Sequence, residues 1–133
     1  MPILLERTSR HSADPRIVAG DSAEQQMAFY LRRGFADDAS LAIFNDLKLS
    51  VGGDGFQIDH LVLHRSGAII IESKSVTTRV RVNALAEWER YFNGSWNGMP
   101  SPIAQANAQA MQFRRLLNAH KADLLGKLAG LLQ

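Results

Sequence analysis

The sequence contains no cysteine. This absence excludes disulfide bonds and zinc sites built from thiolates, and it gives no sign of an oxidising compartment. An excess of one charge is also lacking, because the formal net charge is only +2 at pH 7, so composition alone does not indicate nucleic acid. No run is apolar over the length of a membrane helix, and the N-terminus lacks the apolar core of a signal peptide. We therefore expect a cytoplasmic protein without a membrane partner.

What is present suits one domain with an apolar core: 133 residues, of which 46% are hydrophobic. Residues 1–19 carry scattered charges and little periodicity, and we expect them to form an N-terminal arm. Residues 20–119 show the helix and strand patterns of an α/β domain. Residues 120–133 are leucine-rich and amphipathic, which indicates either the start of a further region or a helix that packs on a partner, as in a homo-oligomer.

The most informative stretch runs from Phe56 to Ser75. Two runs of strand-forming residues flank Ser66-Gly67, a turn signal, and together they predict a β-hairpin. The second run, 68–71, is apolar without alternation. Such a run is typical of a strand that is covered on both faces at the centre of a sheet.

Two acids and a lysine lie at the open end of this hairpin. With Ser66-Gly67 as a two-residue loop, Leu61 faces Glu72, and Asp59 faces Lys74. Because side chains alternate along a strand, the two carboxylates and the ammonium then share one face, whereas a one-residue slip would separate the acids. Buried charges must pair or bind something, so we expect a divalent metal ion here. A solvent-facing pair of Glu72 with Lys74 is the alternative.

A helix is predicted to begin near Gly20. Asp21 suits a helix cap, and Glu24 three residues later completes a capping box. Glu24 also shares a face with Met27 and Leu31 at helical spacing. Its carboxylate therefore either reaches back to cap the helix or points inward, toward the same cleft as the hairpin acids.

The other predicted elements are a strand over 41–49, a glycine-rich loop over 51–55, an edge strand over 76–82, a hairpin within 88–99 with two turn signals, Asn93-Gly94 and Asn97-Gly98, and a helix from Ser101-Pro102 to about Ala119. On that helix an apolar stripe and a set of glutamines occupy different faces. The stripe comprises Ile103, Ala106, Ala110, Phe113 and Leu117, and the glutamines are Gln105, Gln109 and Gln112.

Four pieces in order resemble a known family: the helix start at 20–24, the string Gln57-Ile58-Asp59-His60, the strand 69–74 that ends in Glu72-Ser73-Lys74, and Pro102-Ile103-Ala104-Gln105. They resemble the nuclease-related domain, NERD, within the restriction-endonuclease-like PD-(D/E)xK superfamily, over roughly Ala19 to Ala119. The resemblance implies an α/β fold with a restriction-endonuclease-like core, in which helices flank a mixed central β-sheet. It also implies metal-dependent hydrolysis of phosphodiester bonds, with DNA as the expected partner.

Carried over residue by residue, the resemblance implies that Asp59 and Glu72 ligate Mg²⁺ or Mn²⁺ and that Lys74 orients the attacking water or stabilises developing charge. Glu24 would hold a metal-bound water or a second ion, and Gln105 would line the site. The chain departs from the family's pattern at 75–77, where an aromatic residue is common, and at its leucine-rich end, where further strands often follow.

A catalytically inactive nucleic-acid-binding or assembly module on the same fold is the alternative function. Candidate nucleic-acid contacts are basic residues spread along the chain, with Trp88, Tyr91 and Trp96 as stacking surfaces or as core residues. The basic candidates are Arg79, Arg81, Arg114 and Arg115, the last two of which equally suit the solvated face of a helix. His60 and His64 lie on the opposite face of the predicted strand from Asp59, so we expect them to pack or to face solvent rather than to bind metal.

Overall fold

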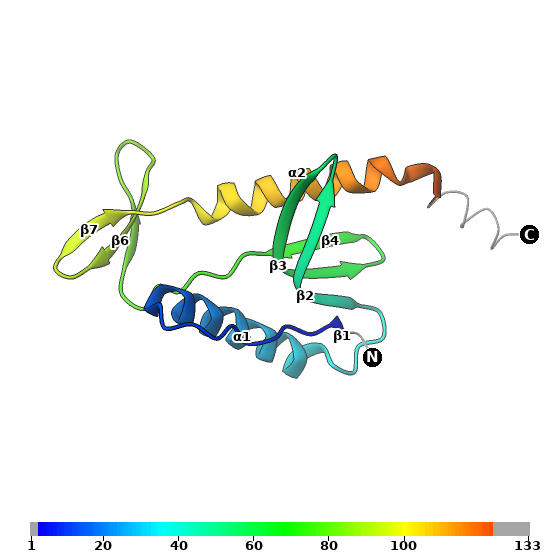
Figure 1. Cartoon of the computed structure of the whole chain (residues 1–133), viewed down its shortest axis with the longest axis horizontal. Helices are drawn as coiled ribbons and strands as arrows, with labels where there is room; N and C mark the ends of the chain where they lie inside the picture. The colour runs from blue at the N-terminus through cyan, green and yellow to red at the C-terminus, as the bar shows by residue number, and fades with distance from the viewer. Residues whose placement is uncertain (1–2, 124–133) are drawn as a thin grey trace, which may run out of the picture.

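The computed structural model describes residues 3–123, which form a four-stranded mixed sheet, a three-stranded antiparallel sheet and two long helices (Figure 1). The order in the larger sheet is β1-β2-β3-β4, with β1 parallel to β2 and the other pairs antiparallel. The predicted α/β class, with helices on either side of a mixed sheet, is confirmed. The elements are β1 (Ile3–Leu5), α1 (Pro15–Phe35), β2 (Ala42–Val51), β3 (Asp54–His64), β4 (Gly67–Ile71), β5 (Val80–Val82), β6 (Trp88–Phe92), β7 (Ser95–Gly98) and α2 (Pro102–Ala119).

Helix α1 begins earlier than the sequence pattern predicted. Asp14 is its N-cap and accepts a hydrogen bond from the backbone N–H of Arg16 at 2.9 Å, and Pro15 occupies the first turn, where a missing N–H costs nothing. The predicted start near Gly20 and the capping box from Asp21 are therefore wrong. Residues 3–19 of the expected arm contain β1 and the first turn of α1.

The β3–β4 hairpin turns one residue earlier than predicted. His64 faces Gly67 and His60 faces Ile71, so the turn residues are Arg65 and Ser66. One further step along this register sets Asp59 opposite Glu72, where Lys74 was expected. The faces are nevertheless as predicted. Moving the turn by one residue shifts each pairing partner by two residues, here from Lys74 to Glu72, and a shift of two keeps every side chain on its face.

Strand β4 lies at the edge of the larger sheet, and Ile69 on it is 50% exposed. The prediction of a central strand was wrong, since an apolar run without alternation does not distinguish a covered strand from an edge. The centre of the sheet is instead the long β2–β3 hairpin, which turns tightly at 52–53 where a loop was expected. Its residues Ile43 and Val62 pack with Leu31 of α1 and Ile3 of β1 as the apolar core.

Helix α2 has the predicted bounds, with Ser101 capping the backbone N–H of Ala104 at 3.1 Å. It packs on β2, β3 and β4. The half-buried face holds the glutamines, whereas Ile103 is 62% exposed and Leu117 is also exposed. Of the apolar stripe, Ala106 and Phe113 are half-buried together with the glutamines, so the face that meets the sheet is mixed.

The smaller sheet has the order β5-β6-β7. Its β6–β7 hairpin turns at Asn93-Gly94 as predicted, both with positive φ as a tight two-residue turn requires. Strand β5 covers only part of the predicted 76–82. In the described part of the chain, no helix has the length and apolarity to cross a membrane. The predicted helix at the leucine-rich end falls mostly on 124–133, outside the described residues.

Candidate active site

A cleft of about 660 Å³ opens where the middle of β3, the residues after β4, the first turns of α1 and the β6–β7 hairpin converge. Four of the five residues expected at the site line it: Glu24, Asp59, Glu72 and Lys74. Gln105 is not among the lining residues. The other walls come from 73–78, from Tyr91 and Phe92, and from 98–100, with Arg16 and Arg90 as further basic side chains.

Asp59 is a buried acid of the cleft, at 8% exposure, as is Glu24. Its Oδ2 accepts a hydrogen bond from the backbone N–H of Ser73 at 2.9 Å. The pKa of Asp59 is raised to about 6, chiefly by burial and also by the neighbouring carboxylates of Glu72 and Glu24, against the lowering effects of the Ser73 hydrogen bond and of Lys74. The position therefore favours either a proton or a cation beside this carboxyl group.

Glu72 is held from two sides. Its Oε1 lies 2.8 Å from Nζ of Lys74, and its Oε2 accepts a hydrogen bond of 2.7 Å from Nε2 of Gln109 on α2. Its side chain is nine-tenths buried while that of Lys74 is 30% exposed. The pair thus sits at the wall of the cleft rather than on an open strand face.

Gln109 was not predicted at the site, although the glutamine face of α2 could have indicated it. Gln105 lies one turn earlier on that face, and its Oε1 is buried without a hydrogen-bond partner among the described residues. Spacing of four residues puts the two amides side by side on a helix. Only the packing of α2 on the sheet decides which of them reaches Glu72.

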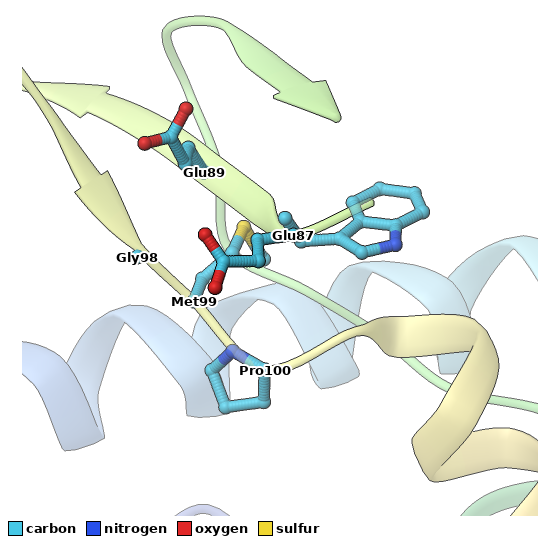
Figure 2. A pocket seen from close by; sticks show the side chains of 6 residues that line it. Glu87, Glu89, Gly98, Met99 and Pro100 are labelled. Atoms are coloured by element: carbon cyan, nitrogen blue, oxygen red, sulfur yellow. The ribbon is translucent and has the colours of Figure 1, made fainter. Parts of the chain in front are cut away.

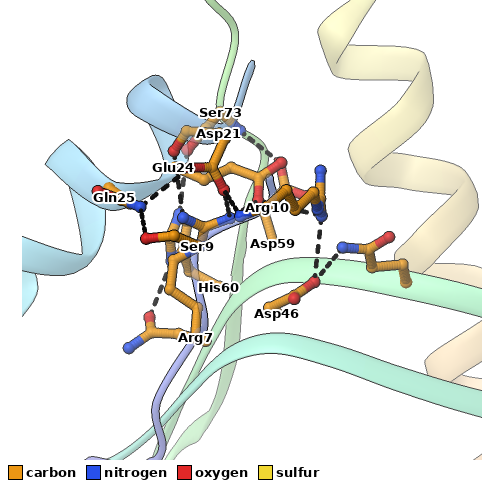
Figure 3. Close-up of polar contacts among 12 residues, drawn as sticks. Arg7, Ser9, Arg10, Asp21, Glu24, Gln25, Asp46, Asp59, His60 and Ser73 are labelled. Atoms are coloured by element: carbon orange, nitrogen blue, oxygen red, sulfur yellow. Dashed lines mark hydrogen bonds and ion pairs between the residues drawn. The ribbon is translucent and has the colours of Figure 1, made fainter. Parts of the chain in front are cut away.

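Glu24 points inward and does not cap the helix. Its Oε2 lies 2.9 Å from Nη2 of Arg7 and 3.4 Å from Nη2 of Arg10 (Figure 3). Arg7 also pairs with Asp21 at 2.7 Å, and this hydrogen bond holds the pKa of Asp21 below its ordinary value. Sequence reasoning missed both arginines because they belong to the stretch interpreted as an arm.

His60 supports Asp59 from the opposite face, where it is fully buried. Its Nδ1 lies 2.8 Å from Oδ1 of Asn45, and its Nε2 lies 3.1 Å from Oγ of Ser73. Burial lowers the pKa of His60 to about 4, so the ring is neutral near pH 7. This chain of contacts fixes Ser73, whose N–H holds Asp59.

The donor set for a metal ion is small. Over residues 3–123, no group of three or more histidine, aspartate or glutamate side chains is arranged to hold a metal. Glu24 is engaged by two arginines, which leaves Asp59 and Glu72. Mg²⁺ commonly takes only one or two carboxylates and keeps several waters, so two acids in an open cleft fit such an ion.

A second hollow of about 520 Å³ adjoins the cleft along β6 (Figure 2). Glu87 and Glu89 line it together with Met99 and Pro100. Their carboxylates already have partners, since Glu87 accepts from Asn83 at 3.0 Å and Glu89 from Arg81 at 2.7 Å. The hollow therefore offers a weaker site than the cleft.

Comparison with curated proteins and with solved structures found no match. The family model for the nuclease-related domain, in contrast, matches residues 19–128. This range holds the four expected site residues that line the cleft, namely Glu24, Asp59, Glu72 and Lys74, and it covers most of the chain. The chain belongs to the nuclease-related domain family.

Proposed function

We propose that this domain is a divalent-metal-dependent nuclease that hydrolyses phosphodiester bonds in DNA, with Mg²⁺ or Mn²⁺ as its cofactor. The observation that carries the proposal is the meeting of Asp59, Glu72 and Lys74 in one cleft, where Asp59 lies in the middle of β3 and the other two follow the end of β4. Membership of a nuclease-related family supports the class of reaction.

The roles follow from chemistry. A divalent ion, when bound, supplies charge neutralisation and a polarised water to the phosphodiester. Asp59 and Glu72 would hold it, and their carboxylates are fixed in place by Ser73 and Gln109. Lys74 would donate hydrogen bonds to the attacking water or to a phosphate oxygen, since its ammonium lies at the cleft wall.

The remaining expected residues would act around this centre. Glu24, held by two arginines, would accept a hydrogen bond from a metal-bound water at the cleft edge. Gln105 would support Gln109 from the same face of α2 rather than meet substrate.

A second candidate is a nucleic-acid-binding or assembly module without catalysis. The specific observation in its favour is that the cleft acids already have cations: Arg7 and Arg10 for Glu24, and Lys74 for Glu72. A cleft that is neutralised internally has less need of a metal ion.

The test is cleavage of labelled single-stranded, duplex and branched DNA, and of RNA, with Mn²⁺, Mg²⁺ or EDTA. We expect metal-dependent cleavage that falls by about 10²-fold or more in Glu72→Ala and in Lys74→Ala, because both act on the reacting groups. Asp37→Asn is the matched control, since Asp37 is an exposed acid on the turn after α1.

Two results would overturn the proposal. Cleavage that survives both alanine substitutions would come from another site or protein. Absent cleavage, together with absent heat of Mn²⁺ binding in calorimetry, would favour the module without catalysis.

A further inference from the structure

One face of the smaller sheet carries arginines and aromatic rings. Tyr91 on β6 is directly opposite Trp96 on β7, and Arg81 on β5 is opposite Glu89. Arg79 precedes β5 and accepts a hydrogen bond from the backbone N–H of Tyr91 at 2.9 Å, which continues the pairing. Alternation along each strand thus sets all five side chains on one face.

These side chains are stacked. The guanidinium carbon of Arg79 lies 4.6 Å from the ring centroid of Tyr91, and that of Arg81 lies 4.1 Å from that of Trp96. The two rings meet edge to face, with centroids 5.4 Å apart. Both rings are half-buried beneath exposed arginines, so each guanidinium is fixed by a ring on one side and open on the other.

The stacked face, which comprises Arg79, Arg81, Tyr91 and Trp96, is continuous with the cleft. Tyr91 belongs to both, and Thr78, next to Arg79, also lines the cleft. The other predicted basic contacts lie elsewhere: Arg115 on α2 is 3.9 Å from Asp54 at the β2–β3 turn. Of the expected nucleic-acid contacts, those on the smaller sheet are therefore the ones joined to the cleft.

The charges on this face are unequal. Arg81 pairs with Glu89 at 2.7 Å, which offsets its attraction for an anion. Arg79 has no carboxylate partner among the described residues. Arg79 therefore suits a phosphate, whereas the outer face of the Arg81 guanidinium, which the Trp96 ring holds in place, offers a flat surface for a base.

We propose that the stacked face binds an unpaired strand of nucleic acid and leads it into the cleft. Flat guanidinium and aromatic groups bind base faces, which are exposed in a single strand and covered by neighbouring pairs within a duplex. The proposal rests on the proposed function, because it names the form of that function's substrate. Binding itself requires neither a metal ion nor cleavage.

The test is fluorescence anisotropy of labelled oligothymidine, and of a duplex of the same length, with the full chain in EDTA. We expect tighter binding of the single strand, and a loss of about tenfold in affinity for it in Arg79→Gln and in Trp96→Leu, as is common for one stacked base. Arg33→Gln is the matched control, because Arg33 is an exposed arginine at the far end of α1. It removes the same charge and should change affinity little.

Each outcome decides. Equal losses in Arg79→Gln and Arg33→Gln would reduce the effect to general charge, and tighter binding of the duplex would contradict base stacking; either overturns the inference. Trp96→Leu could fail to fold, but Arg79→Gln alters only an exposed side chain and keeps the test decisive. Strand binding without any metal-dependent cleavage would support the inference and contradict the proposed function. Metal-dependent cleavage without preferential binding of the single strand would support the proposed function and contradict the inference.

Discussion

Asp59 shows what a buried acid costs the metal-free protein. Its pKa is about 6 when folded against an ordinary 3.8, so the folded state keeps a proton that the unfolded state has released. The free energy of unfolding therefore falls as pH rises from about 4 to about 6 and stays low above that range. Asp59→Asn removes this titration, and we expect it to raise the free energy of unfolding by about 2 kcal/mol at pH 7.5 but little at pH 4.

Urea unfolding of both proteins at the two pH values, in EDTA, measures the difference. Asp37→Asn, at an exposed site, is the control: its free energy of unfolding should differ from that of the wild type by the same amount at both pH values. A difference between wild type and Asp59→Asn that does not change with pH would show that Asp59 has an ordinary pKa. Excess Mn²⁺ should stabilise the wild type most at the higher pH, because the ion competes with the proton.

For single residues, the sequence predicted which side chains line the cleft better than it predicted the residues that hydrogen-bond or pair with them. Alternation along two neighbouring strands was sufficient to group Asp59, Glu72 and Lys74. Arg7 and Gln109 were not predicted, because they meet Glu24 and Glu72 across 17 and 37 residues of chain. Contacts of that range depend on packing, which no local pattern records.

Among the elements, the N-terminal segment is attached to α1 by a buried ion pair. The side chain of Arg7 is only 4% exposed and contacts both Asp21 and Glu24. Arg7→Met leaves Asp21 without a cation and Glu24 with only its longer contact to Arg10 at 3.4 Å, so we expect the free energy of unfolding to fall by about 3 kcal/mol near pH 7.

Thermal or urea unfolding of Arg7→Met and Arg16→Met provides the comparison. Arg16 pairs with Asp14 at 3.6 Å on the surface, with its side chain 85% exposed, so its loss should cost less than about 0.5 kcal/mol. Equal effects from the two substitutions would mean that the segment does not depend on Arg7.

Elements were predicted well where a local signal exists and less well where the signal is tertiary. Ser101-Pro102 and Asn93-Gly94 act through their own backbone, and the helix start and hairpin that they predicted are present. The α1 start was wrong because Asp14-Pro15, a second capping signal, precedes the one chosen. For α2 the sequence predicted its bounds but not which face meets the sheet, where Gln109 binds Glu72.

At the scale of the whole molecule, the cleft lies between two sheets that share no backbone hydrogen-bond pairing among the described strands. The described strands form one sheet of four and another of three, and the connection over 72–79 forms one wall of the cleft between them. Pairing rules predict neighbours within a sheet but do not place one sheet against another. This is why the walls from 98–100 and from Tyr91 were absent from the predicted site.

The two sheets should also differ in stability. The larger one contains fully buried residues such as Ile43 and Ile58, whereas the residues of β5, β6 and β7 are half-buried or exposed. Because short strands with little burial open locally, we expect amides of β6 to exchange with deuterium at least about tenfold faster than those of β3. Hydrogen exchange with mass spectrometry measures this, and oligothymidine should slow exchange in the smaller sheet, over β5, β6 and β7. Equal exchange rates in the free protein would show that both sheets unfold as one unit. Protection by oligothymidine confined to β2 and β3 would show that the nucleic acid binds the larger sheet and not the stacked face.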